Sequence, residues 1–412
     1  MVKKGYKQTE IGVIPEDWEI KYLSDFGKIQ SGGTPSTTMA EYWGGNIAWC
    51  TPSDITSTPT KYINATERTI TDAGLKNSAA TVMPAGSILL CTRATIGELK
   101  INSIPMATNQ GFKNITINNS GNAEFLYYLL QTKKNCMLDL AIGSTFLEIS
   151  KTALIKIPLQ IPMHDEQSKI ADALSDIDNL VVVLEKQIAK KKAIKQGTMQ
   201  ELLTGKKRLP GFSGDWIKSN IGSCIIEKPS YGINAPAVDF NGFLPRYIRI
   251  TDISKDGRYC KDAQASVSAE NVEPFLLKTN DIVLARTGAS VGKSYIYDEH
   301  DGRLVYAGFL IKMSIDPQKA DSRFIFGVLH TYDYWKWIAQ TSMRSGQPGI
   351  NGEEYASYEF RMPSDLKEQK AIADILTNMD NEIVTLGKKL IKYRQVKQGM
   401  MQQLLTGKIR LV

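Results

Sequence analysis

One segment of this 412-residue chain occurs twice, and the repeat constrains the fold more than any other feature of the sequence. The first copy, residues 166–209, is EQSKIADALSDIDNLVVVLEKQIAKKKAIKQGTMQELLTGKKRL. It reappears in register as residues 368–411, EQKAIADILTNMDNEIVTLGKKLIKYRQVKQGMMQQLLTGKIRL. Each copy follows a longer segment of different sequence, so the repeat predicts a tandem, pseudo-symmetric molecule.

Both copies carry the apolar pattern of a long coiled-coil helix. Apolar residues alternate in steps of four and three, the heptad spacing of a helix that packs along another helix. A helix of this size, at about 1.5 Å per residue, would be about 60 Å long. The Leu-Thr-Gly-Lys tails place Gly205 and Gly407 where the helices should end. The predicted seam residues are Ile170, Leu174, Ile177, Val181, Leu184 and Ile188 in the first helix, and Ile372, Leu376, Met379, Ile383, Leu386 and Leu390 in the second.

Two seams of equal length in one chain can pair with each other. Antiparallel pairing would give an intramolecular coiled coil with pseudo-two-fold symmetry, and so long a seam exceeds what one small domain can cover. The alternative is that each seam packs on its own globular domain. The sequence after the first helix, Pro210 to Trp216, resembles residues 15–18 near the N-terminus. The two ends of the chain should therefore lie side by side, and a circular permutant opened near Gly211 should fold.

The segments before the helices predict two globular domains. Short β-branched and aromatic runs between turn clusters are typical of strands and hairpins. One short helix is expected in each domain, at 123–138 and 323–339. The expected class is α+β, with two mainly β, mixed recognition domains joined by the two long helices. The expected boundaries are 1–162 for the first domain, 163–208 for the first helix, 209–363 for the second domain and 364–412 for the second helix.

Composition narrows the class of protein. An apolar fraction of 42% is enough for buried cores, and there is no run of about 18 apolar residues that would predict a membrane span. The five cysteines are scattered without a Cys-x-x-Cys pair, which fits free thiols in a reducing cytoplasm. A net charge of +7 permits a polyanionic partner without requiring one.

The sequence contains no catalytic constellation. The stretch GASVGKS at 288–294 resembles a phosphate loop, but three residues separate its glycines where four are needed, and a strand–loop–strand structure fits better. The three histidines are far apart, and there is no HExxH, GxSxG or GxGxxG motif. The Asn-Pro-Pro-aromatic motif of adenine methyltransferases is absent too. We therefore expect a binding protein with no catalytic residues and no metal site.

Polar and basic residues in turn-rich stretches are the candidates for binding. Arg and Lys recognise guanine, Asn and Gln recognise adenine, and other polar groups hold phosphates. Each residue alone is more often an ordinary solvated loop residue, but both halves carry such sets at matching places with different identities. This suits recognition of two different short DNA sequences. The candidates are Ser31, Thr34, Ser36, Arg93, Thr95, Asn109, Gln110 and Lys113 in the first domain, and Tyr231, Arg286, Thr287, Lys293, Arg344 and Gln347 in the second.

These features together resemble the specificity subunits of type I restriction–modification systems over essentially the whole chain. The heptad helices resemble the conserved spacer regions of that family, and the two variable domains resemble its target recognition domains. Local phrases agree: IPEDW at 14–18, SGGTPS at 31–36 before EYWGG at 41–45, NQGF at 109–112 and the twin LLTGK tails. The second domain departs from the pattern, since EKPSYG at 227–232 replaces the Ser-Gly-Gly-Thr-Pro phrase.

The resemblance implies a non-catalytic subunit that binds double-stranded DNA in the cytoplasm. Each recognition domain would recognise one half of a bipartite, asymmetric site, and the helices would set the spacer and dock two modification (methyltransferase) subunits. Restriction subunits with ATP-dependent motors would join them. S-adenosylmethionine, ATP and Mg are expected in those partners, with no cofactor in this chain and no membrane partner. The alternative is a non-catalytic coiled-coil adaptor that presents two β domains to proteins.

Overall fold

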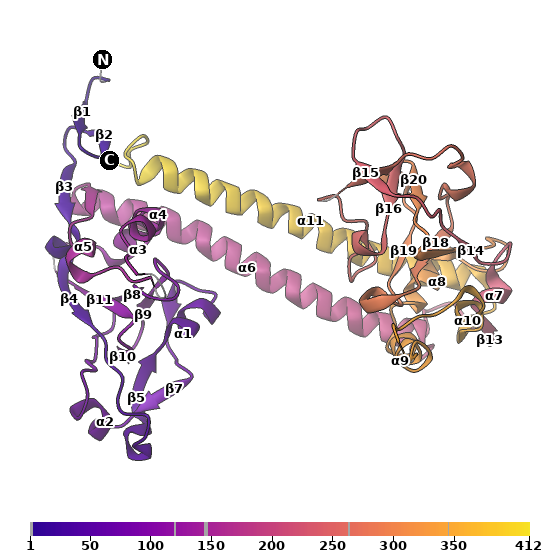
Figure 1. Ribbon diagram of the computed structural model, residues 1–412, viewed down its shortest axis with the longest axis horizontal. Helices are drawn as coiled ribbons and strands as arrows, with labels where there is room; N and C mark the ends of the chain where they lie inside the picture. The colour runs from indigo at the N-terminus through magenta and orange to yellow at the C-terminus, as the bar shows by residue number, and fades with distance from the viewer. Residues whose placement is uncertain (1–2, 119–120, 144–146, 263, 345) are drawn as a thin grey trace. The chain divides into compact units, whose positions relative to one another are not determined.

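The protein is described by a computed structural model that covers residues 3–118, 121–143, 147–262, 264–344 and 346–412 (Figure 1). The chain divides into two compact units. Unit 1 comprises Met1–Gln187 and Leu386–Val412, and unit 2 comprises Ile188–Thr385. Each unit therefore holds one globular domain, part of helix α6 (His164–Leu203) and part of helix α11 (Leu366–Leu404).

The domain of unit 1 is built on two small mixed sheets. One has the strand order β4-β11-β8-β9-β6 and the other β10-β5-β7. Most neighbours are antiparallel, whereas β6 with β9 and β5 with β10 are parallel. Ladders β1-β2 and β12-β3 lie outside them. The strands are β1 Tyr6–Thr9, β2 Gly12–Pro15, β3 Glu19–Tyr22, β4 Gly27–Ser31, β5 Trp43–Cys50, β6 Tyr62–Ile63, β7 Arg68–Ile70, β8 Ile88–Cys91, β9 Leu99–Asn102, β10 Met106–Thr108, β11 Phe112–Ile117 and β12 Pro158–Ile161.

The single helix predicted at 123–138 is two helices. Asn122 caps the first by accepting a hydrogen bond from the N–H of Phe125. Lys133 then leaves the helical conformation (φ −95°, ψ 5°), and its N–H bonds to the carbonyl of Leu130 in a tighter turn. The single-helix prediction was wrong because apolar spacing continues across this break. The helices of the domain are α1 Pro52–Ser57, α2 Asp72–Lys76, α3 Ala123–Thr132, α4 Lys134–Asp139 and α5 Lys151–Leu154.

The domain of unit 2 has a related organisation. Its sheets have the orders β14-β21-β18-β19 and β15-β17-β16-β20, and β13 pairs with β22. The helix predicted at 323–339 is again two helices, because Thr331 caps a new one after α8 ends. The strands are β13 Trp216–Asn220, β14 Ser230–Tyr231, β15 Ala237–Asp239, β16 Arg246–Ile248, β17 Ala265–Val267, β18 Asp281–Ala285, β19 Ser294–Ile296, β20 Leu304–Tyr306, β21 Leu310–Ser314 and β22 Glu359–Pro363. The helices are α7 Ile221–Cys224, α8 Ser322–Val328, α9 Tyr332–Thr341 and α10 Gly352–Ala356.

The core of each unit joins its domain to both long helices. In unit 1, Trp18 packs in one cluster with Ile170 and Leu174 from the start of α6, and with Leu404 and Leu405 from the end of α11. Burying one Leu or Ile side chain stabilises a fold by about 1.5–3 kcal/mol. Unit 2 has the reciprocal arrangement, in which its cluster includes Leu202, Leu203, Ile372 and Leu376.

The two helices run antiparallel in each unit, as predicted. Residue numbers rise along α6 as they fall along α11 in a set of ion pairs between them. The first seam residues of each helix also pack on their own domain, while Val181, Ile188, Met379, Ile383, Leu386 and Leu390 are half-buried. The ion pairs are Asp178–Lys397 and Glu185–Arg394 in unit 1, at 2.6 Å each, and Lys191–Glu382 at 2.7 Å and Lys195–Asp380 at 2.6 Å in unit 2.

An Arg–Glu pair closes unit 1. The guanidinium of Arg410 donates to the carboxylate of Glu166 at 2.7 Å and to that of Asp17 at 2.6 Å. The indole N–H of Trp18 also donates to Glu166, at 3.0 Å. The N- and C-terminal segments therefore lie side by side, as predicted from the sequence (Figure 1).

An equivalent pair closes unit 2. Arg208 donates to both oxygens of Glu368 at 2.7 Å and to the carbonyl of Gly214 at 2.9 Å. Here the chain runs continuously from α6 to Trp216, through Gly205 in the left-handed conformation (φ +71°) that favours glycine. The Glu368 side chain is 1% exposed, and that of its counterpart in unit 1 is 5% exposed.

Candidate nucleic-acid interface

In unit 1, several backbone segments meet at the ends of β4, β8 and β11. The N–H of Gly33 donates to the carbonyl of Thr108 at 2.9 Å, and the N–H of Thr92 donates to that of Gly111 at 2.8 Å. The N–H of Ile149 then donates to the carbonyl of Thr92 at 3.1 Å. The first and third of these bonds join segments that are more than 50 positions apart in sequence.

The same segments meet in unit 2 through the same bonds. The N–H of Ile233 donates to the carbonyl of Tyr306 at 3.0 Å, and the N–H of Arg286 donates to that of Phe309 at 3.0 Å. The N–H of Ile350 donates to the carbonyl of Arg286 at 2.9 Å. The two domains therefore share one backbone framework at this place.

Side chains differ at the matching positions of this framework. Strand register and backbone bridges fix the correspondence, because Ser31 and Tyr231 end equivalent strands and the bridge Arg93–Glu148 matches Thr287–Gly349. A Cβ at Gly32 would meet the Asn109 carbonyl at 2.1 Å, and one at Gly232 would meet that of Ala307 at 2.3 Å, so both domains need glycine here. The differing pairs are Ser31 with Tyr231, Thr92 with Arg286, Arg93 with Thr287, Gly111 with Phe309 and Glu148 with Gly349.

In unit 1 the interface centres on an ion triad. The guanidinium Nη2 of Arg93 lies 2.5 Å from one oxygen of Glu148, and the ammonium of Lys113 lies 3.5 Å from the other. The bond from Arg93 is the main reason that the pKa of Glu148 lies below its ordinary value. The next residue, Ala94, has φ +59°, a conformation that costs a residue with a Cβ about 1–2 kcal/mol. Such backbone strain is common at functional sites.

The structure brings most of the other first-domain candidates into this group. Ser31 pairs with Lys113 across β4 and β11, and the hydroxyl of Thr34 bonds to the side-chain oxygen of Gln110. Asn109 accepts a hydrogen bond from the N–H of Gly111 at 2.9 Å. Two candidates are not part of these contacts: Ser36 bonds to Thr38, and Thr95 is half-buried in the β8–β9 loop.

In unit 2 the interface is aromatic as well as basic. The guanidinium of Arg286 lies 4.9 Å from the ring centre of Tyr231, a cation–π contact. Tyr231 is held in turn by its hydroxyl, which accepts a hydrogen bond from the N–H of Gly352 at 3.1 Å. Phe309, whose carbonyl accepts the hydrogen bond from the N–H of Arg286, is 58% exposed. Among the described residues Arg286 has no carboxylate partner, so its charge is available to a ligand.

The remaining second-domain candidates lie around this group. Gln347 lies against the backbone of Gly288, where an added Cβ would be 2.8 Å from its amide nitrogen, and Thr287 forms the bridge to Gly349. Arg344 is paired with Glu354 at 2.5 Å. The ammonium of Lys293 bonds to a carbonyl in another loop at 3.3 Å, apart from the rest.

The phosphate-loop-like stretch has the strand–loop–strand structure predicted for it. β18 ends at Ala285, a short 3-10 turn covers Gly288–Ser290, and β19 begins at Ser294. A phosphate loop needs a helix after its lysine. Among the described residues, no group of three or more His, Cys, Asp or Glu could hold a metal ion, and no helix is long and apolar enough to cross a membrane.

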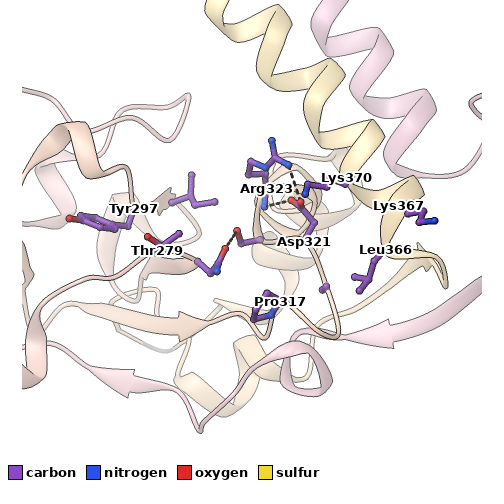
Figure 2. A pocket seen from close by; sticks show the side chains of 12 residues that line it. Thr279, Tyr297, Pro317, Asp321, Arg323, Leu366, Lys367 and Lys370 are labelled. Atoms are coloured by element: carbon purple, nitrogen blue, oxygen red, sulfur yellow. Dashed lines mark hydrogen bonds and ion pairs between the residues drawn. The ribbon is translucent and has the colours of Figure 1, made fainter.

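A cavity of about 590 Å³ lies in unit 2 beside the first turn of α11 (Figure 2). The guanidinium of Arg323 is paired there with Asp321 at 3.0 Å and with Asp374 at 2.6 Å. None of the candidate DNA-binding residues lines this cavity, so it is separate from the interface. Its lining includes Thr279, Tyr297, Pro317, Lys367 and Lys370.

Glu148 and Phe309 belong to the interface but are not among the residues singled out from the sequence. A carboxylate is an unexpected contact for a polyanion, and an isolated Phe between strands is normally core. The repeat alone does not find them, because extending its register would match Glu148 with Ile350, whereas the backbone bonds match Ile149 with Ile350.

Comparison with known proteins identifies the family. The family described as "Type I restriction modification DNA specificity domain" matches residues 15–196 and again residues 215–393. The chain therefore belongs to the type I restriction–modification specificity-subunit family. Its domains correspond to the repeated target recognition domain of that family.

Relatives and a solved structure agree with this assignment. The type I restriction enzyme MjaIX specificity subunit of Methanocaldococcus jannaschii is 42% identical over 184 residues, which cover 44% of this chain and 43% of that protein. The MjaVIII specificity subunit of the same organism is 24% identical over 99% of this chain and 97% of that protein. The crystal structure of a type I S subunit from M. genitalium has the same fold, with a TM-score of 0.61 at 14% identity over 94% of this chain and 96% of that one.

Proposed function

We propose that this chain is the sequence-specific DNA-binding subunit of a type I restriction–modification complex. Each domain would recognise one half of a bipartite, asymmetric site in double-stranded DNA. The observation that carries this proposal is the shared backbone framework, on which five matched pairs of residues differ in their side chains. One framework used twice with different side chains suits two different half-sites.

The side chains supply the chemistry that base recognition needs. The guanidinium groups of Arg93 and Arg286 can each donate two hydrogen bonds to the O6 and N7 atoms of guanine. The amides of Gln110 and Gln347 suit adenine in the same way. The exposed ring of Phe309 can contact a thymine methyl group. These groups come from loops at the ends of strands, which give them a rigid support.

We further propose that α6 and α11 set the spacing between the half-sites and dock two modification subunits. The support is that α6 spans 40 residues and α11 spans 39 without interruption. Domains that bind one face of a duplex lie about 34–36 Å apart per turn, within the length of such helices. Methyl transfer with S-adenosylmethionine, and ATP- and Mg-dependent restriction, would belong to the partner subunits, and this chain would be non-catalytic.

The test is selective methylation of a randomised DNA library by the full chain assembled with its modification subunits. We expect Arg93→Ala to relax one half-site and Arg286→Ala the other, each by about 1–3 kcal/mol, because each removes one two-bond contact to guanine. Removal of one heptad from both helices should change the accepted spacing. Lys21→Ala and Lys218→Ala, which remove cations paired with Glu19 and Glu359, are the matched controls.

Two outcomes would contradict the proposal. An equal loss on all sequences after Arg93→Ala would make that arginine a phosphate contact. Binding to DNA should also weaken steeply with salt, because phosphate contacts release counterions. An assembly that shows no such salt dependence, and no preference among sequences, would favour an adaptor that presents its domains to proteins.

A further inference from the structure

Glu148 connects an exposed cation to a buried one. Its Oε2 lies 2.5 Å from the guanidinium of Arg93, whose side chain is 45% exposed. Its Oε1 lies 3.5 Å from the ammonium of Lys113, whose side chain is 9% exposed. Both oxygens of one carboxylate are thus engaged, one toward the solvent and one toward the sheet.

Lys113 fixes where this carboxylate can lie. Lys113 is in β11, between β4 and β8, so its backbone is held on both sides. A buried ammonium needs a carboxylate partner, because leaving the charge unpaired away from water is costly. Among the described residues Glu148 is the carboxylate that pairs with it. The backbone of Glu148 is also fixed, by hydrogen bonds with Ile142 at 2.9 and 3.1 Å.

Unit 2 holds its arginine by other means. The position of Glu148 is taken there by Gly349, and Arg286 lies on the ring of Tyr231. A Cβ at Gly349 would meet its nearest neighbour, a carbonyl oxygen, at 3.4 Å, which is ordinary contact. The backbone of unit 2 therefore leaves room for a Cβ at this position. The carboxylate is a separate feature of the first domain.

We propose that Glu148 is a positioning residue that determines the specificity of the first recognition domain. Anchored by Lys113, it holds one nitrogen of Arg93 so that the other N–H groups of the guanidinium face guanine. Arginine has five N–H donors in a rigid fork, so this bond leaves enough donors for O6 and N7. The inference rests on the proposed function and names the residue behind its first half-site.

The test uses the full chain with its modification subunits on a randomised DNA library. Wild type is compared with Arg93→Ala, Glu148→Ala and the double variant. We expect Glu148→Ala to lower the preference for guanine about tenfold or more at the position that Arg93→Ala affects. The double variant should lose no more guanine preference than Arg93→Ala alone, because both changes remove the same contact between Arg93 and guanine. The half-site of the second domain should stay unchanged.

A second variant separates positioning from folding. Glu148→Ala leaves Lys113 buried without its carboxylate and can destabilise the sheet. Lys113→Met combined with Glu148→Ala removes both charges and keeps the apolar length of the side chain. Its thermal unfolding should be close to wild type while guanine selection is still lost. Glu19→Ala, which removes an exposed carboxylate of the same unit, should leave selection unchanged.

Three results would overturn the inference. Unchanged guanine selection in the Glu148 variants would show that Arg93 needs no support. A change at a different base, such as a cytosine, would mean that Glu148 itself contacts the DNA. Additive losses in the double variant would show two independent contacts. In each case a selective wild-type complex leaves the proposed function standing, whereas a wild-type complex without any preference would overturn both.

Discussion

The two units differ in opposite ways at the candidate interface and at the junction that closes each unit. At the interface their backbone bonds are the same and their side chains differ, so that Arg93 and Glu148 match Thr287 and Gly349. At the junction the Arg, Glu and Trp side chains are the same and the connection differs. Unit 1 joins two distant segments there, and unit 2 uses one continuous stretch.

The junction of unit 1, where no continuous chain joins the two segments, has polar contacts that the junction of unit 2 lacks. Arg410 bonds to Asp17 as well as to Glu166, and the indole of Trp18 donates to the same glutamate. In unit 2, the indole nitrogen of Trp216 is buried and, among the described residues, has no hydrogen-bond partner. Noncovalent contacts in unit 1 thus hold the segment with Trp18 in place, as the continuous chain holds the segment with Trp216 in unit 2. Matching junctions hold the domains in place while the interface residues vary.

The largest expected loss of stability comes from a substitution at the junction of unit 1. Arg410→Ala removes the partner of a buried glutamate and the link between the terminal segments. We expect it to lower the free energy of unfolding of unit 1 by about 3–5 kcal/mol, as for other broken buried ion pairs. Arg208→Ala should have a smaller effect, because the chain still tethers Trp216 beside α6. Hydrogen exchange measured peptide by peptide reports the two units separately.

Exposed ion pairs provide the control for this comparison. Arg303, paired with Glu273, has a side chain that is 67% exposed, and Arg303→Ala should change little. Equal losses from Arg410→Ala and Arg208→Ala would contradict the role given to the chain connection in unit 2.

A smaller effect is expected in the loops after β8 and β18. Gly288 has φ +70°, and Ala94 occupies the equivalent place with φ +59°. Gly288→Ala should cost about 1–2 kcal/mol and displace Gln347. Ala94→Gly should be close to neutral, because relief of the same strain is offset by greater freedom of the unfolded chain. Urea denaturation measures the free energy of unfolding of both variants. Equally large losses of unfolding free energy in both variants would mean that the two loops are not equivalent.

The smallest expected effect is the dependence of the stability of unit 1 on pH. The hydrogen bond from Arg410 is the main cause of the lowered pKa of Asp17. A carboxyl group with a lowered pKa in the folded state adds stability above its ordinary pKa and loses it as pH falls through the lowered value. Asp17→Asn should therefore cost less than about 1 kcal/mol at neutral pH, and its cost should be smaller near about pH 3. Thermal unfolding at both pH values measures it, and Asp215→Asn, in the matching position of unit 2, is the control.

The helices could be predicted from the sequence more completely than the domains. Heptad spacing is a local property, and it correctly predicts that Ile170, Leu174, Ile372 and Leu376 are buried. The breaks before α4 and α9 were missed, because they depend on capping at single residues such as Thr331 rather than on apolar spacing. The domain boundaries expected from the repeat stay predictions.

The placement of the candidate residues in the fold could be predicted in part. Arg93 and Arg286 follow β-strands in both halves, which the repeat reveals. Lys113 was expected in a turn-rich stretch but lies inside β11, since the apolar residues around it form a strand. Its partner Glu148 comes from a segment that meets β8 only through the fold. The DNA-binding roles of these residues remain predictions to be tested by the variants above.

The discontinuity of unit 1 has a consequence for how the chain is made on a ribosome. Unit 2 is one uninterrupted segment, Ile188–Thr385, whereas unit 1 also needs Leu386–Val412. Leu404, Leu405 and Arg410, which complete the core and junction of unit 1, are synthesised after every residue of unit 2. The domain that begins the chain is thus the last to receive all its parts, and completion runs opposite to the order of synthesis.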